Sequence, residues 1–480
     1  MLLLPNGDVM VQGANDAPVN SWYELKPNAS GNYAKGTWTQ LANMSHGRLF
    51  FGSVVMPNDQ VFVIGGEYST GSSLDNTAEV YDIASNTWKS ASNFLQSSFG
   101  DDPTVTLPNG DILCGYIFGP QTYLYDPVKN TWSNGPTKLD GDASDEETWT
   151  KLHASATLPQ GGILSWSIFA SINSGNFRGQ VYNIATNAWI ETKNSTSNLP
   201  ALLSSPGVGF ELGGAVMLPN GKVLQLGANG NTALYDPSTN TWSAGPQIKD
   251  KNGNLMGADD PPVAILPDGQ VIFTADFGPT SGTFSSPTEI FDYNYTTNTI
   301  TQMTGLPSAL NSSLTKNSAF FDRMLVLPTG QLLFTDASNL YVFTPNDSAQ
   351  DAWRPTITKV VKTSSNTYTL TGLQLSGLSE GSSYGDDVNV SENYPIVQLT
   401  SRGQVYYATT SNWSNALVSP VGDPTVESVD FTLPDNIPDG DYQLTVIANG
   451  ISSARHRITV GPTKCEDGGS KRWGDDVQPQ

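Results

Sequence analysis

The sequence predicts an all-β protein in which a seven-bladed propeller precedes a β-sandwich, and three observations lead to this expectation. The composition is rich in turn formers, with 46 Gly and 31 Pro among 480 residues and only 14% charged residues, as is typical of many short strands. One strand–turn–strand motif occurs seven times within residues 1–354. After residue 354 the motif stops, while strands with alternating apolar residues continue.

The repeated motif is a hairpin whose turn begins with Leu-Pro or Met-Pro. Proline fixes φ for the turn, and Asn or Asp followed by Gly supplies the positive φ that a tight hairpin needs. The copies begin at Leu4, Met56, Leu107, Leu158, Leu218, Leu266 and Leu327. Their spacing is close to the repeat of about 50 residues that kelch-type propeller blades show.

A second hairpin follows several of these copies and ends in a tryptophan. Asp or Asn opens its turn, Asn precedes the outgoing strand, and the terminal aromatic side chain can pack between neighbouring sheets. The clearest examples are residues 79–88, 123–132, 180–189 and 233–242. Each unit therefore supplies four short antiparallel strands, which must stack on other units to bury their faces. A single long sandwich would not repeat the same two turns seven times.

The remainder of the chain divides into a second domain and a tail. Residues 355–462 contain alternating strands with turn signals about every ten residues, which predicts an immunoglobulin-like sandwich. Residues 463–480 are polar, and we expect them to be mobile. The two cysteines, Cys114 in a strand pattern and Cys465 in the tail, are poor partners for each other, so no disulfide framework is expected.

The charge and apolar pattern restrict the partners of the protein. A net charge of −22 repels nucleic acid and anionic membranes. The sequence contains no apolar stretch long enough to span a bilayer, so we expect no membrane insertion, and we expect a monomer.

The location is predicted to be extracellular or at the cell surface. The first residues, MLLLPNGDVM, lack the basic region of a signal peptide and open inside a repeat, so we expect a fragment or a chain that has lost its leader. Glycosylation sequons are about as frequent as chance would produce. They begin at Asn28, Asn43, Asn194, Asn294, Asn311, Asn346, Asn389 and Asn412.

The order of repeats and sandwich resembles the galactose oxidase and glyoxal oxidase family, which joins a seven-bladed kelch propeller to an early-set immunoglobulin-like domain. Strand sequences such as VFVIGGEYS and the closing DGDYQLTVIANG carry the resemblance over nearly the whole chain. It implies a copper site built from a Tyr–Cys cross-linked pair, a second Tyr followed by His, and a His of the C-terminal domain.

The residues at the corresponding positions of this chain do not supply those copper ligands. Counted from the Leu-Pro turns, the cross-linked Tyr falls at Phe50, the Tyr-His pair at Phe320 and Phe321, and the last His within Thr409 to Asn412. The Cys partner would precede Met1. Phenylalanine provides neither the imidazole nor the phenolate that copper(II) needs, so the sequence predicts a relative without copper.

Charged residues gather in the segments that precede the Leu-Pro motifs, where the loops around a propeller axis are expected. The predicted ligand-binding residues are His46, Arg48, Asp101, Asp102, Glu146, Glu147, His153, Glu211, Asp259, Asp260, Asp322 and Arg323. A further Asp pair, Asp386 and Asp387, lies in the C-terminal domain. An Asp before a strand also commonly accepts backbone N–H bonds in a turn, and this structural role is the alternative for each pair.

Three functions remain open at the sequence level. The leading hypothesis is a module that binds carbohydrate or a cell-wall polymer, because carboxylates accept hydroxyl groups; Ca²⁺ held by Asp101, Asp102, Asp259 and Asp260 would also suit this ring. The second is a carbohydrate-active hydrolase, lyase or isomerase that uses axial carboxylates with His46 or His153. The third is a copper radical oxidase, which the missing ligands make the weakest.

Overall fold

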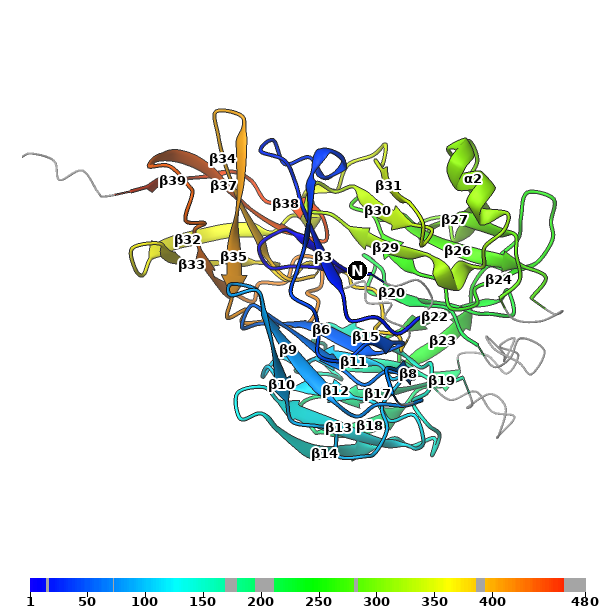
Figure 1. The fold of residues 1–480 in the computed structure, drawn as a ribbon. Coiled ribbons are helices and arrows are strands. Elements are labelled where there is room, and N and C mark those ends of the chain that lie inside the picture. Colours follow the sequence, from blue (N-terminus) through cyan, green and yellow to red (C-terminus); the bar gives the residue numbers. More distant parts are fainter. Residues whose placement is uncertain are drawn as a thin grey trace, which may run out of the picture.

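The computed structural model describes residues 1–13, 17–71, 73–168, 179–194, 211–279, 284–385 and 393–461. Within these residues the chain is almost entirely β, and sheets of the propeller fan around an axis with a sandwich beside them (Figure 1). The predicted fold class is therefore confirmed. The tail at 463–480, Cys465, Asp386 and Asp387 lie outside the described residues. None of the described helices is long and apolar enough to cross a membrane.

The first four blades each contain four antiparallel strands in chain order. Blade 1 is β1 (Leu2–Leu3), β2 (Val9–Gln12), β3 (Trp22–Lys26) and β4 (Thr37–Gln40). Blade 2 is β6 (Gly52–Met56), β7 (Gln60–Ile64), β9 (Ala78–Asp82) and β10 (Thr87–Ala91). Blade 3 is β11 (Thr104–Thr106), β12 (Ile112–Cys114), β13 (Gln121–Asp126) and β14 (Thr131–Thr137). Blade 4 is β15 (Thr148–Leu152), β16 (Gly162–Trp166), β17 (Gly179–Asn183) and β18 (Ala188–Glu191).

The last three blades depart from four strands, contrary to the sequence-based expectation. Blade 5 has β20 (Ala215–Met217), β21 (Val223–Leu226), β22 (Thr232–Asp236), β23 (Thr241–Ala244) and an added β19 (Lys193–Asn194). Blade 6 has β25 (Val263–Ile265), β26 (Val271–Phe277), β27 (Thr288–Asn294), β28 (Thr299–Gln302) and an added β24 (Met256–Gly257). Blade 7 has only three described strands, β29 (Arg323–Val326), β30 (Leu332–Thr335) and β31 (Leu340–Phe343).

Short elements lie between these strands. They are η1 (Tyr33–Lys35), the ribbon of β5 (Arg48–Leu49) with β8 (Tyr68–Ser69), α2 (Ser308–Leu314), η3 (Ala319–Phe321) and η4 (Asp351–Trp353).

Both hairpins of a blade form for the predicted reasons, as blade 3 shows. Gly110 adopts φ 86° and its N–H bonds to Leu107 O at 2.9 Å, which closes the Leu-Pro turn. In the second hairpin Asn130 adopts φ 52° and accepts the Tyr125 hydroxyl at 2.9 Å. Trp132 packs on Tyr125 and donates its indole N–H to Ser92 O of the preceding blade at 2.8 Å. The tryptophan therefore packs between neighbouring sheets, as expected.

The C-terminal sandwich is built from eight strands, and β35 pairs with strands of both its sheets. They are β32 (Thr356–Lys362), β33 (Thr367–Leu373), β34 (Ile396–Ser401), β35 (Gln404–Ser411), β36 (Glu427–Thr432), β37 (Gly440–Ala448), β38 (Ile451–Ser452) and β39 (His456–Val460). Buried side chains such as Leu370, Leu399 and Phe431 fill its interior.

The sandwich docks against the Leu-Pro turns of the propeller. A Cβ placed on Gly7 would lie 2.7 Å from the Tyr407 ring, and one on Gly161 would collide with Leu417. Glycine is therefore required at these turns by the close approach of the second domain as well as by its positive φ. The opposite ends of the inner strands, where the charged segments begin, face away from the sandwich.

Candidate functional site

The turns that lead into the inner strands share one backbone conformation in four blades. Phe50, Asp101, Glu146 and Asp260 adopt φ values of 52°, 49°, 49° and 51°. A left-handed conformation costs about 1–2 kcal/mol for a residue with a Cβ. Because it recurs at Phe50, which carries no polar group, the blade geometry imposes it rather than the chemistry of a site.

Backbone hydrogen bonds join these turns from blade to blade. Asp101 N donates to Phe50 O at 3.3 Å, Glu146 N donates to Asp101 O at 2.8 Å, and Asp260 N donates to Leu212 O at 3.2 Å. The turns therefore follow one another around the axis in chain order.

Three side chains of these turns form a compact group, the axial carboxylates Glu146, Glu211 and Asp260. One carboxylate oxygen of each lies within 4.8 Å of the others. Asp260 is 3% exposed, whereas Glu146 and Glu211 are half-buried and reach solvent. Carboxylates this close repel one another unless protons, hydroxyl groups or a cation lie between them. The group is thus suited to accept several hydrogen bonds from one ligand.

A segment of the C-terminal domain runs along the axis to this group. Ser383 exchanges backbone hydrogen bonds of 2.9 Å with Trp149 of β15, and Glu380 forms a buried ion pair of 3.1 Å with Lys151. At the end of the segment the Tyr384 hydroxyl donates to Asp260 Oδ1 at 2.5 Å. The phenol therefore belongs to the site, although no local pattern around Tyr384 indicates this role.

This arrangement corrects the expected position of the C-terminal contribution. Thr409 to Asn412 do not reach the axial carboxylates: Thr410 N donates to Pro5 O at 3.2 Å and Asn412 N donates to Pro57 O at 2.5 Å. Both acceptors belong to Leu-Pro or Met-Pro turns, at the other end of the inner strands. The loop before β34, rather than β35 and the residue after it, brings a side chain of the C-terminal domain, Tyr384, to the axial carboxylates.

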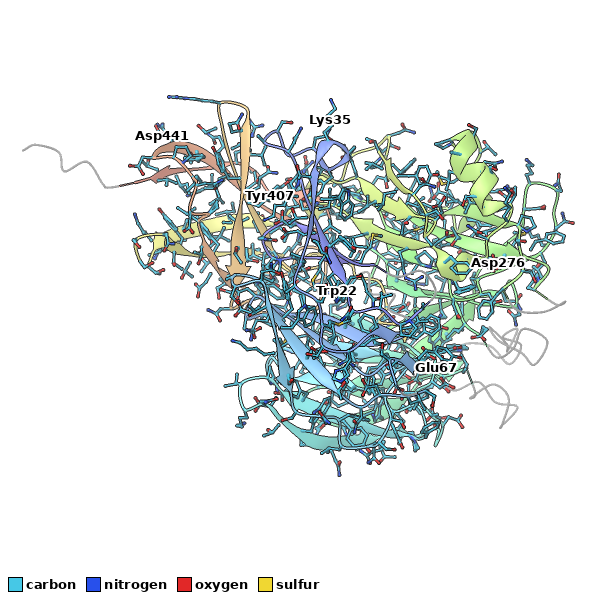
Figure 2. All side chains as sticks on the ribbon, viewed as in Figure 1. Trp22, Lys35, Glu67, Asp276, Tyr407 and Asp441 are labelled. Carbon is cyan, nitrogen blue, oxygen red and sulfur yellow. The ribbon has the colours of Figure 1, made fainter. Side chains whose placement is uncertain are left out.

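An exposed aromatic ring stands beside the axial carboxylates. Tyr68 of β8 is 49% exposed, and its ring contacts Phe50 edge to face with centroids 5.8 Å apart. Glu67, labelled in Figure 2, most strongly raises the pKa of the Tyr68 phenol, and partial burial, Asp101 and Glu146 raise it further. The phenol is thus close to the acidic group, while the face of the ring is available to a ligand.

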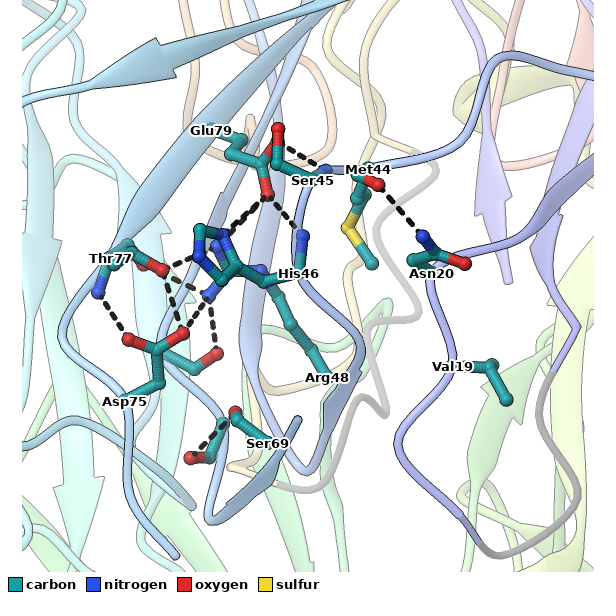
Figure 3. A network of polar contacts seen from close by, with 12 residues as sticks. Val19, Asn20, Met44, Ser45, His46, Arg48, Ser69, Asp75, Thr77 and Glu79 are labelled. Atoms are coloured by element: carbon teal, nitrogen blue, oxygen red, sulfur yellow. Dashed lines mark hydrogen bonds and ion pairs between the residues drawn. The ribbon is translucent and has the colours of Figure 1, made fainter. Parts of the chain in front are cut away.

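Arg48 and His46 lie instead in a network within blade 2 (Figure 3). The Arg48 side chain is fully buried, with ion-pair distances of 3.4 Å to Asp75 and 3.1 Å to Glu79. It also donates to Gly65 O at 2.6 Å. His46 is 3.7 Å from Glu79, and 45% of its side chain is exposed. This placement corrects the expectation that Arg48 faces a ligand, because every direction around its guanidinium is occupied by protein.

Glu147 and Asp102 have the structural role that was the alternative for each acidic pair. Both side chains are fully buried. Glu147 forms an ion pair of 2.9 Å with Lys138 and accepts the Ser165 hydroxyl at 2.6 Å. Asp102 accepts Ile117 N at 2.9 Å, and burial, followed by Asp145, raises its pKa well above the ordinary range. Neither carboxylate joins the axial group.

His153 is placed at the wrong end of its strand for the predicted role. It follows β15, whereas Glu146 precedes it, and the five residues of this strand separate the two by roughly 16 Å. The His153 Nδ1 lies 2.9 Å from Ala154 O, near the Leu-Pro turn. A histidine-assisted reaction at the axial carboxylates is therefore not supported by His153.

The remaining predicted residues belong to blades 6 and 7. Asp259 Oδ2 accepts Phe284 N at 2.5 Å, and Asp322 is fully buried, which raises its pKa well above the ordinary range. Arg323 donates to Asp322 O at 2.7 Å and lines a pocket of about 260 Å³ that also contains Phe321. These residues flank the axis without entering the group of three.

The structure also corrects the set of predicted calcium ligands, Asp101, Asp102, Asp259 and Asp260. Asp101 and Asp260 are the equivalent residues, since each lies three positions before the inner strand of its blade. Both Asp pairs precede a proline, but the left-handed residue is the first member of one pair, Asp101, and the second member of the other, Asp260. Asp102 and Asp259 point into the protein, so an ion at the axis would meet Glu146, Glu211 and Asp260.

The buried carboxylates near Asp259 give the first testable prediction. Burial raises the pKa of Asp259 to about 7 and that of Asp276, labelled in Figure 2, to about 8 from an ordinary value of 3.8. Between about pH 4 and 8 these two carboxyl groups hold protons in the folded protein that they release in the unfolded chain. The contribution of the two groups to the stability of the fold therefore falls as pH rises.

We expect Asp276→Asn to flatten this dependence. Thermal melting at pH 5 and pH 8 should show that the variant gains stability relative to the wild type as pH rises, because it lacks a carboxyl group that ionises in the unfolded chain while staying protonated in the folded protein. A variant that instead loses stability relative to the wild type between pH 5 and 8 contradicts the assignment. Asp250→Asn, in an exposed turn, is the control and should follow the wild-type curve.

Comparison with known proteins supports the architecture. The Kelch motif matches residues 48–95, which include blade 2 and the turn that leads into it. Two galactose oxidases of Gibberella zeae are each 33% identical over 88 residues, or 18% of this chain and 12% of theirs. The match thus spans 12% of the length of these relatives.

A solved structure resembles the chain over nearly its full length. The fungal alcohol oxidase of the AA5 family, solved in complex with copper, covers 96% of both chains with a TM-score of 0.53 and 13% sequence identity. The structural similarity indicates a shared fold. Because the sequence identity is low, the chemistry has to be judged from the residues present.

Proposed function

We propose, from the premise that this chain is a galactose oxidase-like kelch protein, that it binds carbohydrate at the axial carboxylates and does not act as a copper oxidase. The observation that carries the proposal is the convergence of Glu146, Glu211 and Asp260 within 4.8 Å beside the half-exposed ring of Tyr68. We further propose an extracellular or cell-surface location, where such polymers occur.

The arrangement suits a sugar because it offers two kinds of contact. Ionised carboxylates accept strong hydrogen bonds from hydroxyl groups, and two oxygens per group allow one carboxylate to serve neighbouring hydroxyls. The Tyr68 ring offers a flat apolar surface with a polar edge, which can pack against the C–H face of a pyranose. Tyr384 fixes Asp260 through its 2.5 Å hydrogen bond, so part of the site is ordered before a ligand arrives.

The donor set does not fit the copper site that the fold family implies. Copper(II) is suited by imidazole together with phenolate, whereas carboxylate oxygens suit hard cations such as Ca²⁺. The sequence has three histidines. His46 lies beside Glu79, His153 lies near a Leu-Pro turn, and His456 is the first residue of β39. Phe50, at the position of the expected cross-linked tyrosine, carries no oxygen. The axial group is composed of carboxylates and one phenol.

A glycan array with a matched metal measurement tests this proposal. Fluorescently labelled protein should bind a defined set of oligosaccharides, and binding should be competed by the free sugar. Metal analysis of protein loaded with Cu²⁺ and dialysed should give well under one copper per chain, and no hydrogen peroxide should form from dioxygen when galactose is supplied. One tightly held copper per chain with peroxide release would establish the oxidase alternative, and an array without any signal would refute carbohydrate binding.

The same samples address Ca²⁺, which the sequence analysis raised. If an ion mediates recognition, array binding should be lost in a chelator and restored by Ca²⁺ alone. If the carboxylates accept sugar hydroxyls directly, the chelator should leave binding unchanged. Either result supports a polyhydroxylated ligand at the axial carboxylates and distinguishes how it is held.

A further inference from the structure

Three buried side chains near the end of β26 carry oxygen atoms without a hydrogen-bond partner. Asp276, labelled in Figure 2, is 3% exposed, and its Oδ2 has no partner. Thr274 lies two residues earlier on the same face of the strand, and Asp322 follows η3; both are fully buried. The Thr274 hydroxyl and both carboxylate oxygens of Asp322 are also unpartnered. Buried polar atoms without partners destabilise a fold, so their presence requires an explanation.

The hydrogen bonds of Asp276 hold its carboxylate in a fixed direction. Its Oδ1 accepts the Thr288 hydroxyl at 2.6 Å and the Ala319 N–H at 2.9 Å. Thr288 lies opposite Asp276 on β27, and Ala319 is the first residue of η3. The carboxylate therefore connects blade 6 to the segment that leads into blade 7. Both bonds use Oδ1, so Oδ2 is held in place while remaining available to a ligand.

Asp322 approaches Thr274 and Asp276 from the end of η3. Its N–H bonds to Ala319 O at 2.9 Å. Burial raises the pKa of the Asp322 carboxyl well above the ordinary range, Thr274 lowers this pKa, and Asp276 raises it further. Such effects weaken with distance, so the three side chains are close neighbours. The Thr274 hydroxyl is nevertheless not placed to form a hydrogen bond with the carboxylate.

A second buried carboxylate of blade 7 shows how a purely structural role differs. Asp336 is also fully buried, but its Oδ1 accepts two backbone N–H groups at 3.0 and 2.7 Å. Among the residues that the structure describes, Asp322 alone has a buried carboxylate with both oxygens unpartnered. The adjacent Arg323 donates to the main-chain oxygens of Phe320 and Asp322 at 2.5 and 2.7 Å. The Asp322 carboxylate thus lacks the donors that a structural role would provide.

We propose that a Ca²⁺ ion binds between β26 and η3, held by Asp276, Asp322 and Thr274, and that it joins blade 6 to blade 7. The unpartnered atoms of these side chains are four oxygens, namely Asp276 Oδ2, both oxygens of Asp322 and Thr274 Oγ1. Carboxylate and hydroxyl oxygens are the ligands that hard cations prefer, and water completes the coordination of Ca²⁺. The two carboxylates together balance the charge of the ion.

This calcium site is separate from the axial carboxylates and does not depend on carbohydrate binding. Asp322 and Thr274 are fully buried, whereas Glu146 and Glu211 reach solvent. Without the ion the buried carboxyl groups hold protons, and binding of the ion releases them. The pH dependence predicted for Asp276→Asn therefore applies to the ion-free protein.

Calcium titration of the full chain, stripped with a chelator and dialysed, tests the proposal. Isothermal titration calorimetry should show saturable binding of Ca²⁺. The melting temperature should rise by about 2–3 °C at a hundredfold excess of Ca²⁺ over its dissociation constant. The double variant Glu211→Gln with Asp260→Asn, which lacks two of the axial carboxylates, should show the same rise. No saturable binding by the wild type, or loss of the rise in this double variant, overturns the proposal.

Two substitutions in the calcium site complete the test. Asp322→Asn keeps the size of the side chain but removes a charged ligand, so it should weaken Ca²⁺ binding at least about tenfold. Thr274→Val replaces the unpartnered hydroxyl by a methyl group, so it should weaken binding while the ion-free protein melts no lower than the wild type. Asp250→Asn, in an exposed turn, should bind as the wild type does. Wild-type affinity in Asp322→Asn overturns the proposal, whatever the stability of the other variants.

Discussion

Replacing Arg48 with methionine is expected to lower the free energy of unfolding by about 3–5 kcal/mol. The substitution leaves Glu79, which is 1% exposed, without its cation and removes the hydrogen bonds to Gly65 O and Thr77 O. Chemical denaturation followed by tryptophan fluorescence measures the change. Glycan binding by the fraction that remains folded should equal that of the wild type, because Arg48 does not face the ligand.

An exposed ion pair provides the matched control. Arg457 and Asp441 lie 2.7 Å apart, but their side chains are 70% and 55% exposed, so Arg457→Met should cost less than about 1 kcal/mol. If Arg48→Met were as mild as this control and at the same time lost glycan binding, the sequence-based role of Arg48 as a ligand-binding residue would stand after all.

The double substitution Glu211→Gln with Asp260→Asn should weaken binding of the best oligosaccharide from the array by about a hundredfold or more, since it replaces two charge-assisted hydrogen bonds by neutral ones. The double substitution removes two of three carboxylates that repel one another, so it should relieve this repulsion in the folded state. Isothermal titration measures the affinity, and thermal melting confirms the fold.

Two comparisons make this result specific to the axial carboxylates. Asp126→Asn with Asp250→Asn removes two carboxylates from outer turns and should leave the affinity unchanged. Tyr68→Ala should weaken binding while leaving the charge of the site intact, because it removes only the stacking surface. A double variant that binds as tightly as the wild type would show that the sugar is held elsewhere.

The propeller could be predicted because its turns are encoded locally. Leu-Pro-Asn-Gly and Tyr-Asp-Pro-x-x-Asn-Thr-Trp each specify a hairpin through residues that are adjacent in sequence, as Gly110 and Asn130 show. Counting Leu-Pro motifs alone could not reveal that the described part of blade 7 has three strands.

The candidate site could be predicted only in part, because its members meet through tertiary structure. The axial carboxylates lie in the loops before the inner strands that the sequence indicated, yet the choice between Asp259 and Asp260 depends on a one-residue offset that only the backbone path settles. Tyr384 reaches Asp260 from more than a hundred residues further along the chain. Tyr68 comes from a two-residue strand, too short to be recognised by periodicity.

A crystal structure of the protein with its best oligosaccharide bound tests the central claim most directly. The account predicts a sugar ring against Tyr68 with hydroxyl groups, or a Ca²⁺ ion that carries them, within coordinating or hydrogen-bonding distance of Glu146, Glu211 and Asp260. A sugar bound on the outer rim, with no contact to the axial carboxylates, would contradict it. A copper ion held near Phe50 and Phe321 would contradict it as well.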